Sequence, residues 1–104
     1  MKEKRSHPRF NTVIKVQDVD TLKTGWTKDL SPGGCLIEKS DEFDFLPMAS
    51  RLTLKLEIPG VDETITVKGI VRQKGKNREG FGIQFDPVDK RSAFYIERYL
   101  GNFL

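Results

Sequence analysis

The stretch Leu52-Thr53-Leu54-Lys55-Leu56-Glu57-Ile58 decides the fold class, because apolar and polar residues alternate along it without exception. Strict alternation puts every apolar side chain on one face of a β-strand and every polar side chain on the other. The predicted strand is therefore half buried, with one face on a core and one face in water. Pro59-Gly60 follows at once and ends it, as such pairs do in turns.

Segments with the same period of two lie on both sides of this strand and are separated by turn residues. The segment over residues 64–73 is also rich in β-branched residues, which favour strands. The predicted strands cover about residues 10–16, 22–29, 35–38, 52–58, 64–73 and 81–85. This pattern predicts a mainly β fold, and short strands with frequent turns favour a small antiparallel barrel or sandwich.

The apolar period changes from two to about 3.6 after residue 85. Asp86 is a suitable N-cap, Pro87 suits a first helical turn, and Asp89 adds favourable charge near the positive end. Apolar residues then recur at helical spacing with two tyrosines beside them: Ala93, Ile96, Leu100 and Phe103, flanked by Tyr95 and Tyr99. We predict a C-terminal α-helix over about residues 87–101 that packs its apolar stripe on the barrel.

The chain has 104 residues, 37% of them hydrophobic, which suits one domain with a single modest core. Residues 1–9 are polar and basic and contain Pro8, so a flexible N-terminal arm is expected before a single domain over residues 10–104. No apolar run reaches membrane-spanning length, and no apolar signal region follows Met1. The single cysteine, Cys35, suits a reducing compartment. We therefore expect a cytoplasmic protein without membrane insertion.

The sequence offers little for catalysis. It holds one histidine, His7, which lies in the expected arm, and one cysteine, which lies in an apolar strand. No spacing of histidine, cysteine or carboxylates resembles a metal site, and there is no Walker-type phosphate loop. We expect no enzyme, no metal and no cofactor.

Two arginines of the arm, Arg5 and Arg9, are the first candidate ligand residues. In an extended chain their origins lie about 13 Å apart on the same side of the backbone, at about 3.3 Å per residue. Guanidinium groups form bidentate hydrogen bonds with phosphate oxygens and with the O6/N7 edge of guanine, and they stack on purine faces. A solvated basic tail is the alternative interpretation of the same residues.

The segment from Asp29 to Gly34 is the second candidate. The Asp29 carboxylate could accept hydrogen bonds from the N1–H and N2–H₂ groups of guanine, and Ser31 adds a hydroxyl group. Gly33 and Gly34 would let a base or a phosphate come close to the backbone. Asp, Ser, Pro and Gly are also the common residues of an ordinary β-turn, so this segment alone does not distinguish a site from a turn.

The two motifs, in this order and followed by a glycine-containing closing strand, resemble the PilZ domain family. The parts that carry the resemblance are Arg5-x-x-x-Arg9, Asp29-x-Ser31-x-x-Gly34 and the segment 80–85. The resemblance covers nearly the whole chain, and no motif position departs from the family pattern. It implies a six-stranded antiparallel β-barrel with a C-terminal α-helix that binds the bacterial second messenger cyclic di-GMP.

The resemblance also implies roles for individual residues. Arg5 and Arg9 would clamp guanine and phosphate groups, Asp29 and Ser31 would read a guanine, and the glycines would permit close approach. Lys4 stands just before the first arginine. In this family, the residue at that position influences whether one ligand molecule or an intercalated pair binds. Arg72 is a further candidate for a phosphate contact, from the basic hairpin that follows residue 68.

The expected function is that of a receptor whose arm becomes ordered on binding cyclic di-GMP and which signals to a separate, unidentified partner protein. One alternative is an adaptor of the same fold that binds proteins without the ligand. A third is a small basic barrel that binds single-stranded nucleic acid through exposed aromatic side chains. We disfavour nucleic acid, because Phe81, Phe85 and Trp26 are all expected in the core.

Overall fold

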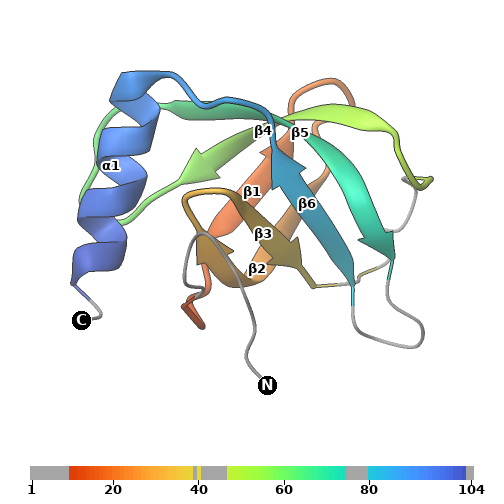
Figure 1. Cartoon of the computed structure of the whole chain (residues 1–104), viewed down its shortest axis with the longest axis horizontal. Coiled ribbons are helices and arrows are strands. Elements are labelled where there is room, and N and C mark those ends of the chain that lie inside the picture. Colours follow the sequence, from red (N-terminus) through yellow and green to blue (C-terminus); the bar gives the residue numbers. More distant parts are fainter. Residues whose placement is uncertain (1–9, 39, 41–46, 75–79, 103–104) are drawn as a thin grey trace.

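The computed structural model of the chain describes residues 10–38, 40, 47–74 and 80–102 (Figure 1). Within these ranges the chain forms strands β1 (Lys15–Asp18), β2 (Thr24–Ser31), β3 (Gly34–Ile37), β4 (Arg51–Glu57), β5 (Ile65–Lys74) and β6 (Phe81–Phe85), followed by helix α1 (Lys90–Gly101). The strands close into a barrel in the order β1-β2-β3-β6-β5-β4, and every neighbouring pair is antiparallel. The predicted antiparallel barrel is confirmed, and closure excludes an open sandwich.

Strand β4 has the burial that its alternating sequence predicts. Leu52, Leu54 and Leu56 are buried, whereas Lys55 and Glu57 are exposed. β4 is hydrogen-bonded to β1 on one side and to β5 on the other. Its three leucines belong to the hydrophobic core, so its apolar face lies against the barrel interior. The core also takes apolar side chains from each of the other strands and from α1, among them Val16, Leu30, Cys35, Ile37, Val67, Val71, Phe81, Ile83, Phe85, Ile96 and Leu100.

The chain before β1 does not form the long first strand that the sequence predicts. Alternation is preserved, since Thr12 and Ile14 are buried, but the regular ladder begins only at Lys15. The Thr27 hydroxyl is the physical reason. It accepts from the Ile14 N–H (2.9 Å) and donates to the Thr12 carbonyl (2.7 Å), so side-chain hydrogen bonds stand here beside the backbone bond from the Thr27 N–H to the Ile14 carbonyl (3.0 Å).

Trp26 was predicted to lie in the core, but it is 51% exposed. It lies opposite Lys15 in the β1–β2 pair. Its neighbours along β2, Gly25 and Thr27, are buried, so Trp26 belongs to the outer face of the barrel. The other two aromatic residues expected inside, Phe81 and Phe85, are buried as predicted.

Helix α1 begins later than predicted. Its N-cap is Asp89 rather than Asp86, with an extended backbone and a carboxylate that accepts from the Ser92 N–H at 3.1 Å. The first helical residue is therefore Lys90, and Pro87 lies before the helix. The predicted end at about residue 101 agrees with Gly101.

The delayed start has a tertiary cause. The Asp86 N–H donates to the Lys68 carbonyl at 2.8 Å, which continues the contact of β6 with β5 beyond Phe85. The Asp86 carboxylate pairs with Arg51 of β4 at 3.3 Å. Asp86 is thus held on the barrel wall, and the chain can turn into a helix only after it.

The helix packs on the barrel through a narrow stripe. Ser92, Ile96 and Leu100 are its buried residues, whereas Phe94 is 56% exposed. Ala93, predicted on the stripe, is only partly buried, and Phe103 lies outside the described residues. In Figure 1, α1 stands at one end of the barrel beside the connection between β4 and β5.

Candidate functional site

The segment from Asp29 to Gly34 forms the end of β2, the turn after it and the start of β3. Asp29 was predicted to end its strand, but β2 continues to Ser31. Asp29 lies opposite Leu36, and Ser31 lies opposite Gly34. Leu30, between them, is fully buried, so Asp29 and Ser31 share the outer face of the barrel.

A bulge precedes the site. The register of β2 and β3 shifts between Thr27 and Asp29, so Lys28 has no partner opposite it. Bulges re-aim the side chains that follow them and increase local twist. Here the bulge sets which residues of the hairpin face outward, and Asp29 is one of them, partly buried.

The Ser31 hydroxyl is engaged inside the turn. It accepts from the Gly33 N–H at 3.2 Å and donates to the Gly34 carbonyl at 3.3 Å. Ser31 is also buried, at 4% exposure. Its single proton is therefore used within the hairpin, and what the residue does in the structure is hold the turn in shape.

The two glycines connect the hairpin to β6. The Gly33 carbonyl accepts from the Phe85 N–H at 2.9 Å. Gly34 lies opposite Gln84, and a Cβ atom at Gly34 would lie 2.3 Å from the carbonyl oxygen of Ile83. No residue with a side chain fits there without a shift of the backbone, so the sheet itself requires glycine at position 34.

Arg72 lies on the same outer face, two strands away from the hairpin. Its exposed side chain donates from Nε to the Gln84 Oε1 atom at 2.7 Å. Gln84 is opposite Gly34 on one side and Ile70 on the other. A row of paired positions therefore runs across the barrel wall from Ser31 through Gly34 and Gln84 to β5.

Gln84 was not among the site residues predicted from the sequence. A signal for it exists, because Gln84 is the only polar side chain in the strand Phe81-Gly82-Ile83-Gln84-Phe85, and alternation places it on the outer face.

The remaining predicted ligand residues, Lys4, Arg5 and Arg9, lie outside the described residues. The first described residue, Phe10, lies at the site. Its N–H donates to the Leu30 carbonyl at 3.1 Å, and the Leu30 N–H donates to the Phe10 carbonyl at 3.0 Å. This isolated bridge was not anticipated, and it fixes the chain beside the strand that carries Asp29 and Ser31.

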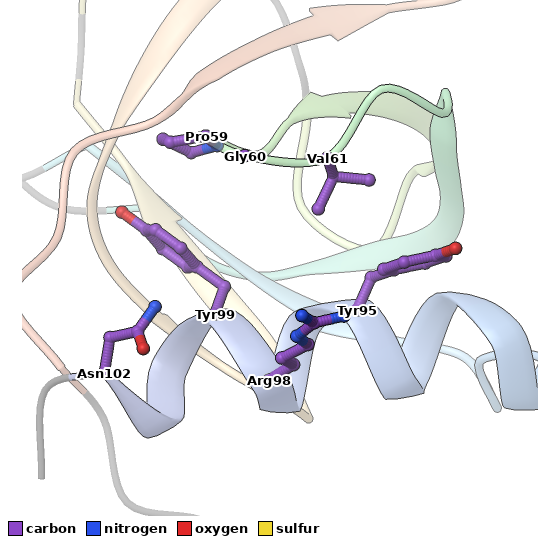
Figure 2. A pocket seen from close by; sticks show the side chains of 7 residues that line it. All are labelled: Pro59, Gly60, Val61, Tyr95, Arg98, Tyr99 and Asn102. Carbon is purple, nitrogen blue, oxygen red and sulfur yellow. The ribbon is translucent and has the colours of Figure 1, made fainter.

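A separate cavity of about 240 Å³ lies between α1 and the loop after β4 (Figure 2). Tyr95 and Tyr99 project from the helix toward Pro59 and Val61. The Tyr99 hydroxyl lies 2.7 Å from the Thr12 hydroxyl, so this helix contacts the chain that leads into β1. None of the predicted ligand residues that the structure describes lines this cavity.

The described part of the chain offers few side chains for metal binding or for thiol chemistry. Among the described residues there is no group of three or more His, Cys, Asp and Glu side chains that could hold a metal ion. Cys35 is completely buried, as expected for a core residue. Over the same part of the chain, no helix has the length and apolar character to cross a membrane.

A closed six-stranded antiparallel barrel with one C-terminal helix defines the class of fold. The family model of the PilZ domain matches the sequence over residues 3–102, and the chain belongs to this family. The resemblance found in the two motifs is thereby confirmed. PilZ domains are binding and adaptor domains, and the family is associated with cyclic di-GMP as its ligand.

Two solved structures share the fold. An inhibitor of motility from Bacillus subtilis (MotI/DgrA) superposes with a TM-score of 0.82 at 17% sequence identity, over 98% of this chain and 51% of that one. The chain thus spans about half the length of that protein. The PilZ domain of CeSA from a cellulose-synthesizing bacterium superposes with a TM-score of 0.65 at 20% identity, over 92% of this chain and 97% of that domain. No functionally curated protein matches the sequence.

Proposed function

We propose that this PilZ domain is a receptor for cyclic di-GMP, which binds on the outer face of the barrel at the β2–β3 hairpin. One observation carries the proposal. Two backbone hydrogen bonds hold Phe10 opposite Leu30, the residue of β2 that lies between the polar residues Asp29 and Ser31.

The reach of the chain supports this assignment. Arg9 is covalently bonded to Phe10, which is paired with Leu30 at the site, and consecutive Cα atoms are only about 3.8 Å apart. Arg5, four residues further, can be no more than about 14 Å from Arg9 along an extended chain. A guanidinium group could therefore act on a ligand at the hairpin from either position.

The ligand contacts would differ in kind. The Asp29 carboxylate would accept from the Watson–Crick edge of guanine, and the arginines would bind phosphates or stack on purines. Ser31, Gly33 and Gly34 would present the turn in the required shape, because the hydroxyl and the glycine backbone are already engaged in holding it. Lys4 would affect only how many ligand molecules bind.

The proposed mechanism is ordering of the N-terminal arm. Neutralisation of the arginines by phosphate groups would draw residues 1–9 across the hairpin and create a new surface for a separate partner protein. No bond is made or broken, so the domain would not act as an enzyme. Cyclic di-GMP is an intracellular messenger, so the proposal also requires a cytoplasmic location, as the sequence predicts.

Isothermal titration calorimetry with cyclic di-GMP tests the proposal. Replacing Arg5, Arg9 or Asp29 with Ala removes at least one charge-assisted hydrogen bond, which is worth about 1.5–3 kcal/mol, so affinity should fall more than about tenfold. Arg98→Ala is the matched control, since this exposed arginine lies on α1 (Figure 2). A flat titration of the folded wild-type protein at tens of micromolar ligand would reject the receptor.

The second candidate, a ligand-independent adaptor, is favoured by one observation. Val13 and Trp26 are 64% and 51% exposed on the outer side of the segment before β1 and of β2. Exposed aromatic and aliphatic side chains are typical of protein contacts. The same exposure of Trp26 removes one argument against nucleic acid, but Phe81 and Phe85 remain buried and leave no row of stacking side chains there.

A further inference from the structure

We propose that Arg72 and Gln84 form a phosphate subsite of the proposed ligand site, in which Gln84 acts as a positioning residue for Arg72. The inference rests on the proposed function, since it assigns a further part of the same site. The hydrogen bond from Arg72 Nε to Gln84 Oε1 at 2.7 Å carries it.

The pair has a defined polarity. A guanidinium group can only donate, so the Gln84 amide must accept with its oxygen and keep its NH₂ group as a donor. The Nε–H bond leaves both terminal nitrogens of Arg72 available along one edge of the guanidinium plane. The two terminal nitrogens of Arg72 therefore offer donors to a ligand, and a phosphate group offers only acceptors.

The location also suits a ligand that reaches from the hairpin. Gln84 is directly opposite Gly34 in the β3–β6 register, and Gly34 is directly opposite Ser31. Neighbouring strands are about 4.8 Å apart, so Gln84 lies about 10 Å from Ser31 across the wall. Gly34, which lies between them in this row of paired positions, adds no side chain of its own.

Gln84 limits the freedom of Arg72. An exposed arginine loses rotamer entropy when it binds a ligand, and a partner that already holds its Nε–H reduces that loss. Arg72 also stands where the β5–β6 register shifts between Val71 and Gln73, at a bulge that re-aims its side chain. We expect Arg72 to contact the phosphate and Gln84 to act through it.

The test is a double-mutant cycle measured by calorimetry with cyclic di-GMP. Arg72→Ala should weaken binding about tenfold or more, as for other lost charge-assisted contacts. Gln84→Met keeps the size of the side chain but cannot accept the hydrogen bond, and should weaken binding by a smaller factor. In the Arg72→Ala background, Gln84→Met should have no further effect, because the residue it positions is absent.

Gln84→Glu supplies a second readout that a merely structural role would not change. The carboxylate would still hold Arg72 but would neutralise it, so affinity should fall while the melting temperature stays at the wild-type value. Wild-type affinity in Arg72→Ala, or effects of the two substitutions that multiply in the double mutant, would overturn the inference. A wild-type protein that does not bind at all would instead reject the proposed function.

Discussion

Gly34 shows how one residue can satisfy a motif and the fold together. The family motif requires glycine at this position, and the structure explains it without a ligand, because a Cβ atom would lie 2.3 Å from the Ile83 carbonyl oxygen. That oxygen belongs to the backbone of β6 and cannot turn aside as the end of a side chain could. The hairpin and β6 must therefore separate if position 34 carries a side chain.

We predict that Gly34→Ala destabilises the domain even without ligand. Forcing one methyl group into close-packed structure costs about 1–3 kcal/mol, and each kcal/mol lowers Tm by about 4–8 °C in a domain of this size. Thermal unfolding followed by circular dichroism measures the change. Gly101→Ala is the matched control, since a Cβ atom there meets nothing within 4 Å. Equal melting temperatures for the two variants would contradict the steric argument.

Asp89 is a residue whose effect is felt over a whole element, α1. The hydrogen bonds from Ser92 hold the pKa of the Asp89 carboxyl below its ordinary value of 3.8. A lowered pKa in the folded state means that the ionised form stabilises the helix. This stabilisation is fully present above the unfolded-state value and is lost as the pH falls through the lower folded-state value.

Asp89→Asn should therefore reduce Tm near neutral pH and have a smaller effect in acid. Asparagine is an equally suitable N-cap residue but cannot ionise, so the variant separates the charge from the hydrogen bond. Melting curves of both proteins between pH 7 and about pH 2 measure the difference. A difference in Tm that stays constant over this range would show that the charge of Asp89 contributes nothing.

Tyr99 connects α1 to another element, the segment that leads from Phe10 into β1. Its hydroxyl lies 2.7 Å from the hydroxyl of Thr12, which is 6% exposed. Tyr99→Phe leaves the Thr12 hydroxyl with fewer partners, so the free energy of unfolding should fall by about 1 kcal/mol. Chemical denaturation in urea measures it, with Tyr95→Phe as the control on the same face of the helix (Figure 2). Equal losses in both variants would argue against a specific contact with Thr12.

Sequence patterns predicted the elements better than their ends. Alternation in β4 and helical spacing around Ile96 each follow from local periodicity, and both are confirmed. The ends depend on partners far away in sequence. Asp86 and Asp89 are both suitable caps, and the contacts of Asp86 with the Lys68 carbonyl and with Arg51 decide between them.

The hairpin of the candidate site shows the same limit. The residue types of the turn were evident in the sequence, but the engagement of the Ser31 hydroxyl within it was not. Gln84 and Arg72 lie in different strands, and only the register of the closed barrel brings them together. Periodicity gives the face on which a side chain lies, whereas neighbours across the sheet come from topology.

At the scale of the whole molecule, closure of the barrel joins the ligand site to global stability. The hairpin is hydrogen-bonded to β6 through Gly33, and the segment at Phe10 is hydrogen-bonded to β2. Unfolding would disrupt both contacts and so destroy the proposed site. A ligand that binds only the folded domain stabilises it by mass action, by about 2.7 kcal/mol when its free concentration is 100 times Kd.

We therefore predict that saturating cyclic di-GMP raises Tm by more than about 10 °C, at about 4–8 °C per kcal/mol. Arg9→Ala should keep the Tm of the ligand-free wild type, because the predicted arm supports no core, and should lose most of the ligand-dependent rise. Differential scanning calorimetry of both proteins, with and without the dinucleotide, measures the four melting temperatures.

A short single-stranded oligonucleotide serves as the comparison ligand, since the messenger and a nucleic acid carry the same phosphate chemistry. A rise with the oligonucleotide and none with cyclic di-GMP would replace the receptor with a nucleic-acid-binding barrel. A lower ligand-free Tm in Arg9→Ala would show instead that the arm contributes to the fold.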